Sequence, residues 1–294
     1  MTSTNLHKNM CGYQILATVK FMFVIVVIAL STYPLALSAQ GDLLITPRRV
    51  VFEGNRQQQE ITLANTGQDT AKYSISFVQY RMTEEGGFEQ IESPEPGQFF
   101  ADAYLRFFPR SVTLAPNESQ VVRMQLRRLP DMVNGEYRSH MYFRAVPDEK
   151  PLGEEDMLAD TSAIGIRLTP IFGITIPVII RIGELNAGVR LSNLTLKLNE
   201  DTPPDFSLTM NREGNQSVYG DLTINYVPSV GEPIEVGIVR GIAIYTPNSK
   251  RNFSMQLSQP DGVDYSSGKL VVRYSSASEA KPEMYDEQEL LLNK

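Results

Sequence analysis

Between Ile164 and Ile180, apolar side chains occupy every second position for about 17 residues. The even positions carry isoleucine, leucine, valine or phenylalanine, and Pro170 is the one exception. An alternation of period two places one set of side chains on one face of a β-strand. Ordinary strands contain 3 to 10 residues. At about 3.3 Å per residue, a single strand of this length would extend well beyond a normal β-sandwich.

Two interpretations account for this segment, and the periodicity alone favours neither. In the first, Pro170 or Gly173 divides it into two core strands of ordinary length, because proline cannot donate a ladder hydrogen bond. In the second, it is one long edge strand whose first part projects beyond the core and pairs with a partner chain. The preceding residues 148–160 are acidic and contain glycine and proline. A polar loop of this kind suits the second interpretation.

The rest of the chain after Gly41 consists of short alternating runs separated by turn signals, and no segment has sustained helical periodicity. Pro47 interrupts the first run, residues 43–52, at a point where a chain can switch sheets or sit at an edge. Seven or so strands fit on each side of residues 181–183. The sequence therefore predicts an all-β protein with two sandwich domains, 40–182 and 183–294.

The first 39 residues have the pattern of a secretory signal. Lys8 and Lys20 precede an apolar run at 21–30, and small residues follow at Ser38 and Ala39, so cleavage is expected after Ala39. The alternative is an uncleaved membrane anchor, for which the run is short of about 20 apolar residues. The sole cysteine lies within this segment, so the exported chain would fold without disulfides.

The composition argues against several functional classes. The formal net charge is −7 and there is no basic stripe, so no nucleic-acid partner is expected. His140 is the one histidine after the signal segment, and no cysteine follows that segment, so a zinc site with the usual ligands is not expected. A Ser-His-Asp triad has no local signature in the sequence either. No phosphate-binding glycine loop occurs. The sequence thus predicts no enzyme, no cofactor, no metal and no small-molecule substrate.

Three stretches of the first domain together carry a family resemblance. They are Arg-Arg-Val-Val-Phe-Glu-Gly at 48–54, Phe-Pro-Arg-Ser-Val-Thr-Leu-Ala-Pro-Asn-Glu-Ser-Gln-Val-Val-Arg-Met at 108–124, and the strand at 137–147 that follows Leu-Pro. In this order, behind a signal segment, they resemble the PapD-like periplasmic chaperones of pilus assembly. The resemblance covers nearly the whole chain after the signal segment.

The resemblance implies two immunoglobulin-like β-sandwich domains arranged at an angle. It also implies a periplasmic function in pilus and fimbrium biogenesis, by donor strand complementation. The chaperone lends its long strand to a pilus or fimbrial subunit that lacks one, until assembly at the outer-membrane usher replaces it. No covalent step is involved. The donor residues expected from the resemblance are Ile164, Ile166, Leu168 and Phe172.

Members of this family bind the C-terminal carboxylate of the subunit between an arginine of the first strand and a lysine of the long strand. The arginine corresponds to Arg49, whose guanidinium can bind both carboxylate oxygens. Pro177 stands where the family has its lysine. Arg167 and Arg181 are therefore the possible second cations.

A structural salt bridge is also expected from the resemblance, with Arg123 as the cation and Glu136 as its partner. An alternative function is a structural or adhesive surface protein built from two immunoglobulin-like modules, which would have no partner with a missing strand. A carbohydrate-active enzyme would need two catalytic carboxylates, and nothing in the sequence singles out such a pair.

Overall fold

The computed structural model describes residues 43–130, 132–147, 171–277 and 283–292. The predicted signal segment lies outside these ranges, and so do the expected donor residues Ile164, Ile166 and Leu168 and the possible cation Arg167. Within the described ranges, no helix has both the length and the apolar character needed to cross a membrane.

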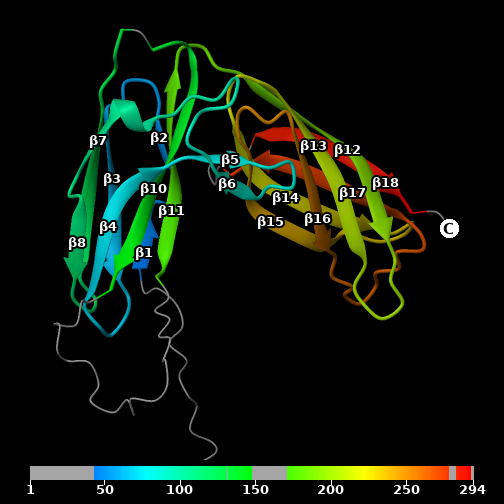
Figure 1. The fold of residues 1–294 in the computed structure, drawn as a ribbon. Coiled ribbons are helices and arrows are strands. Elements are labelled where there is room, and N and C mark those ends of the chain that lie inside the picture. The colour runs from blue at the N-terminus through cyan, green and yellow to red at the C-terminus, as the bar shows by residue number, and fades with distance from the viewer. Residues whose placement is uncertain (1–42, 131, 148–170, 278–282, 293–294) are drawn as a thin grey trace, which may run out of the picture. The chain divides into compact units, whose positions relative to one another are not determined.

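The first sandwich consists of two sheets that enclose one apolar core (Figure 1). One sheet has the order β1-β3-β9-β7, and the other has the order β2-β11-β10-β4-β8. Inward side chains such as Phe52, Leu63 and Phe143 are fully buried between them, because alternate residues of each strand face the same side. The strands are β1 (Leu43–Thr46), β2 (Val50–Phe52), β3 (Gln58–Asn65), β4 (Ala71–Val78), β7 (Leu105–Phe108), β8 (Ser111–Leu114), β9 (Ser119–Leu126), β10 (Gly135–Val146) and β11 (Gly173–Ile182).

The second sandwich encloses a separate core between the sheets β12-β13-β16 and β15-β14-β17-β18. Its largest fully buried side chains are Phe206, Tyr226 and Tyr274. The predicted all-β fold with two sandwich domains is thus confirmed. The strands are β12 (Ala187–Lys197), β13 (Asp205–Gly214), β14 (Val218–Val227), β15 (Ile234–Ile244), β16 (Lys250–Gln256), β17 (Lys269–Ser276) and β18 (Met284–Leu291).

The first strand changes sheets at Pro47, which is one of the two outcomes that the sequence left open there. β1 pairs with β3 in one sheet, whereas β2 runs parallel to β11 in the other. Pro47 lies between them, and a residue without a backbone N–H is tolerated there because neither ladder needs a donor from it. The switch brings Arg48 and Arg49 to the start of β2.

The alternating segment is a strand from Gly173 onward. Ile176, Val178 and Ile180 belong to the first core, so the predicted alternation is confirmed over this part of the segment. Ile179 faces the other side, where it packs with Met82, Ala243 and Tyr245. Residues 171 and 172 precede the strand without being part of it.

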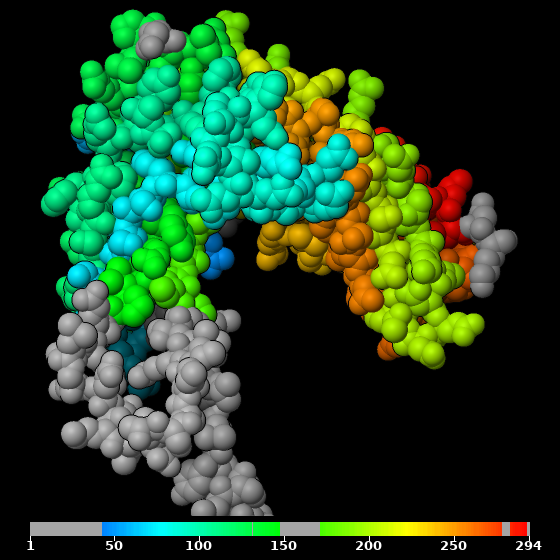
Figure 2. Space-filling model, in the orientation of Figure 1, coloured from blue at the N-terminus to red at the C-terminus, as the bar shows by residue number. Residues whose placement is uncertain are grey.

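A short hairpin, β5 (Tyr80–Met82) and β6 (Phe88–Gln90), joins residues of the two sandwiches. The Asn248 side chain donates to the Met82 carbonyl at 2.8 Å. The Asn252 amide donates to the Glu84 carbonyl at 2.7 Å. Figure 2 shows the hairpin in cyan against the orange residues around β16. A 3-10 turn, η1 (Asp102–Tyr104), precedes β7.

Candidate functional site

The outer edge of β11 is only partly covered by its neighbours in the sheet. β10 pairs with the whole strand from Gly173 to Ile182, whereas β2 pairs with it only from Val178 to Ile180. Of the strands in the described ranges, none pairs with the β2 side of β11 between Gly173 and Pro177. Among the described residues, this half of the edge is therefore open for the addition of a further strand.

The side chains at this open edge are apolar and exposed. Ile171 is 45% exposed, Phe172 50% and Ile174 37%. The Phe172 carbonyl accepts a hydrogen bond from the Ala145 amide at 2.9 Å, so Phe172 already follows the direction of the strand. Of the four expected donor residues, Phe172 is the one within the described ranges, and it lies at this exposed end.

Arg49 lies where the open half of the edge ends. It immediately precedes Val50, which is level with Val178 of β11. Its side chain is half-buried and held by two tyrosines of the second sandwich. Nη1 donates to the Tyr245 hydroxyl at 3.3 Å. The guanidinium carbon lies 4.7 Å from the ring centre of Tyr219 and 5.5 Å from that of Tyr245, which is within the range of cation–π attraction.

Arg181, on β11, is the second cation at this position. Its Nη1 lies 3.1 Å from Glu53 Oε2, and its Nε lies 3.3 Å from Glu136 Oε2. Its Nη2 donates to the Ser217 carbonyl at 3.4 Å. The side chain is 21% exposed, so it remains accessible from one side.

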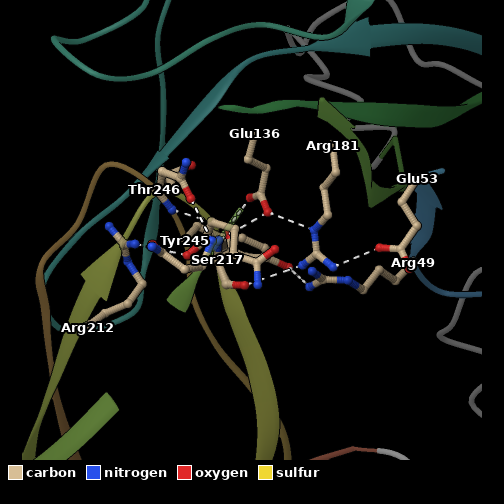
Figure 3. Close-up of polar contacts among 11 residues, drawn as sticks. Arg49, Glu53, Glu136, Arg181, Arg212, Ser217, Tyr245 and Thr246 are labelled. Atoms are coloured by element: carbon tan, nitrogen blue, oxygen red, sulfur yellow. Dashed lines mark hydrogen bonds and ion pairs between the residues drawn. The ribbon is translucent and has the colours of Figure 1, made fainter. Parts of the chain in front are cut away.

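Arg49 and Arg181 line one cavity of about 450 Å³, and Figure 3 shows their guanidinium groups side by side. Tyr219 and Tyr285 form part of its wall, and Glu283 contributes a carboxylate. A cavity with two arginines can hold a carboxylate group by charge-assisted hydrogen bonds. The resemblance gave Arg49 as the anchor and Arg181 as one of two possible second cations, and Arg49 and Arg181 line the same cavity.

Glu136 is the buried carboxylate beside this cavity. Its side chain has no exposed surface, and besides Arg181 it accepts hydrogen bonds from the amide and the hydroxyl of Ser217. The Ser217 hydroxyl in turn accepts from the Thr246 amide at 3.3 Å (Figure 3). Glu136 on β10 thus binds the backbone amide and the hydroxyl of Ser217 in the second sandwich, so this buried carboxylate has hydrogen-bond partners as well as an ion pair.

Two further arginines surround this carboxylate. The Arg138 guanidinium lies 4.2 Å from the ring centre of Tyr245, and burial lowers its pKa to about 10. Burial also lowers the pKa of Arg212, an effect that the charge of Glu136 opposes. Four guanidinium groups therefore lie near three carboxylates, Glu53, Glu136 and Glu283, which leaves a surplus of one positive charge around the cavity.

The expected salt bridge between Arg123 and Glu136 is not formed. Arg123 pairs with Glu60 at 3.0 Å on the solvent face of the β3-β9 ladder, where the two side chains are 79% and 59% exposed. Glu136 lies on the other sheet of the sandwich and pairs with Arg181. The prediction was wrong because Arg123 and Glu136 belong to different sheets and face different surroundings.

Three residues of this site carry no signal in the sequence. Tyr219, Tyr245 and Ser217 come from the second sandwich, and the bond between Arg49 and Tyr245 joins residues 196 positions apart. Tyr245 follows β15 directly and Ser217 precedes β14 directly. Neither periodicity nor a motif in the sequence indicates which side chain meets Arg49.

Comparison with models of known protein families gives no match, and comparison with curated protein sequences gives none either. Among solved structures, the chain is similar to the Pseudomonas aeruginosa CupB2 chaperone, with 13% identity, a TM-score of 0.40 and coverage of 84% of this chain and 98% of that one. It is similar to the class 5 fimbriae chaperone CfaA, with 14% identity, a TM-score of 0.38 and coverage of 86% and 99%.

A third similar structure is the CsuC–CsuE complex of a chaperone with a tip adhesion subunit from Csu pili of Acinetobacter baumannii. There the identity is 14%, the TM-score is 0.42 and the coverage is 83% of this chain and 97% of that one.

Proposed function

We propose that this chain is a periplasmic chaperone that holds a pilus or fimbrial subunit by adding the edge of β11 to it. The open half of that edge, Gly173–Pro177, is the observation that carries the proposal. An unpaired apolar edge is an aggregation hazard that proteins usually cover. The open edge lies beside the exposed side chains of Phe172 and Ile174. A partner strand that completes the hydrogen-bond ladder of β11 would explain why this edge is kept.

The subunit's C-terminal carboxylate would bind to Arg49 and Arg181. Arg49 lies where the open edge ends, and a guanidinium can hold both carboxylate oxygens. Arg181 lines the same cavity and would take the place of the family lysine, which is absent at Pro177. The surplus positive charge of the neighbouring arginines favours an anion there. Arg167, the other possible cation, lies outside the described residues.

The remaining parts of the proposal come from the sequence resemblance. Residues 1–39 would direct export and be removed. Ile164, Ile166 and Leu168 would extend the donated strand beyond the described end of β11. The subunit would stay bound until assembly at an outer-membrane usher replaces the donor, with no covalent step.

Co-expression with candidate subunits encoded near this chain's gene tests the proposal. The wild-type chain should form a soluble one-to-one complex with one of them, measured by size-exclusion chromatography with light scattering. Arg49→Glu should weaken the complex by at least about thirtyfold, because it turns an attraction for the carboxylate into a repulsion. Ile174→Lys should prevent strand addition by placing a charge at the apolar edge.

Each variant has a matched control. Arg48→Glu makes the same charge change at the exposed neighbour of Arg49. Ile238→Lys alters an isoleucine of similar exposure, 40%, on β15 of the second sandwich. Both controls should bind like the wild type, and circular dichroism should be unchanged in all four variants. A complex that survives both Arg49→Glu and Ile174→Lys would show that neither the edge nor the anchor is used.

A further inference from the structure

The anchor residue Arg49 belongs to the first sandwich, but its side-chain contacts come from the second. Tyr245 accepts its Nη1 hydrogen bond, and the rings of Tyr219 and Tyr245 lie against its guanidinium. Tyr219 is level with Ala243 in the β14-β15 ladder, so Tyr245, two residues further on, projects to the same face. The two rings therefore form an aromatic wall on one face of the second sandwich.

Tyr245 is placed to hold Arg49 and not to bind a ligand itself. It is 5% exposed, and Arg138 lies over its ring as well. Phe88 of the β5–β6 hairpin contacts the ring with centroids 6.1 Å apart. A ring fixed by so many neighbours gives its hydroxyl one position, and burial raises its pKa, so the hydroxyl remains neutral where Arg49 donates to it.

We infer that Tyr245, supported by Tyr219, is a positioning residue that orders the Arg49 guanidinium for a terminal carboxylate. This inference rests on the proposed function. A free arginine side chain loses much rotamer freedom when it forms a bidentate pair, and a side chain that is already ordered loses less, so the complex is tighter. The second sandwich thereby strengthens the preference of Arg49 for a chain end over an internal segment, although the first sandwich supplies both Arg49 and the edge.

The test uses two synthetic peptides of the same alternating valine–threonine sequence, one ending in a carboxylate and the other in a carboxamide. Binding to the full chain is measured by calorimetry. The wild type should prefer the acid, and Arg49→Gln should remove that preference. Tyr245→Phe loses one hydrogen bond, so its preference for the acid should fall roughly fivefold, while its affinity for the amide stays unchanged.

Tyr265→Phe is the matched control, because it removes another tyrosine hydroxyl bond of the second sandwich, from Tyr265 to the Ser258 carbonyl at 2.5 Å. Its preference for the acid should equal that of the wild type. A second measurement is the Nε–Hε NMR signal of Arg49, which should report faster side-chain motion in Tyr245→Phe than in either the wild type or the control.

The outcomes separate the inference from the proposed function. If the wild type binds neither peptide, both are overturned. If the wild type prefers the acid through Arg49 and Tyr245→Phe keeps the full preference with an unchanged Arg49 signal, the inference fails and the proposed function stands. A loss of preference together with a mobile Arg49 supports the inference.

Discussion

The substitution Glu136→Gln tests whether the buried carboxylate joins the two sandwiches. Glutamine has nearly the same shape, but one carboxylate oxygen becomes an amide nitrogen. Glu136 accepts from Arg181 Nε, from the Ser217 amide and from the Ser217 hydroxyl. An NH₂ group cannot accept from these donors, so at least one of them loses its acceptor inside the protein.

The size of the effect follows from these contacts. A hydrogen bond to a charged group contributes about 1.5–3 kcal/mol, and a buried donor left without an acceptor costs about 1–3 kcal/mol. Arg181 keeps Glu53 as a partner and is 21% exposed, so the loss of its bond to Glu136 costs less free energy. Ser217 is buried, so a donor of Ser217 left without an acceptor costs more. We expect Glu136→Gln to lower the free energy of unfolding by about 3 kcal/mol.

Urea titration measures this change. The chain contains 13 tyrosines and no tryptophan, so tyrosine fluorescence and far-UV circular dichroism are suitable probes. With a slope of about 3 kcal/mol per molar urea, the midpoint should fall by about 1 M. The control is Glu60→Gln, which removes the exposed pair with Arg123 and should change stability by less than about 1 kcal/mol. Equal midpoints for the two variants would refute the role given to Glu136.

Two further predictions concern stability. Burial, followed by the charge of Arg138, lowers the pKa of His140 to about 3, so between about pH 6 and pH 4 the unfolded chain binds a proton that the folded chain does not. The free energy of unfolding should fall with decreasing pH in this window, by up to about 1.4 kcal/mol per pH unit from this residue. Urea titrations at each pH should show that His140→Phe removes this contribution. Gly86→Ala should cost more than Gly54→Ala. Both glycines have a positive φ, but a methyl group at Gly86 would displace the Arg251 guanidinium, whose Nη1 donates to the Ala243 carbonyl at 2.6 Å, whereas Gly54 has open space. Equal midpoints in urea would contradict this prediction.

The fold could be predicted because the signals that define a strand lie within a short stretch of sequence. Alternation selects the face of each strand, and turn residues mark where each one ends, so Ile176, Val178 and Ile180 could be assigned to a core before their neighbours were known. The interruption at Pro47 was predictable for the same reason, because proline has no N–H to donate to a ladder. Whether the chain would switch sheets there or sit at an edge was left open by the sequence.

The site was only partly predictable because its contacts join distant parts of the chain. The resemblance indicated Arg49 and Arg181, but the residues that hold them depend on which strand ends of the second sandwich lie nearby. Tyr245 looks like any apolar residue at the end of a strand. The pair of Arg123 and Glu136 was expected from the resemblance and was wrong, since a resemblance in sequence does not show which sheet each residue of this chain joins.

The registers also determine the direction of the strand that the open edge could receive. β2 covers β11 from Val178 onward and runs parallel to it, so an added strand would lie in line with β2 and end beside Arg49. If the carboxylate end of that strand meets Arg49, the strand runs in the same direction as β11. The open residues Gly173–Pro177 span about 16 Å, so only the last five or so residues of a partner would pair with the described part of β11. Binding through so short a ladder needs a further source of affinity at its end, which the two arginines would supply.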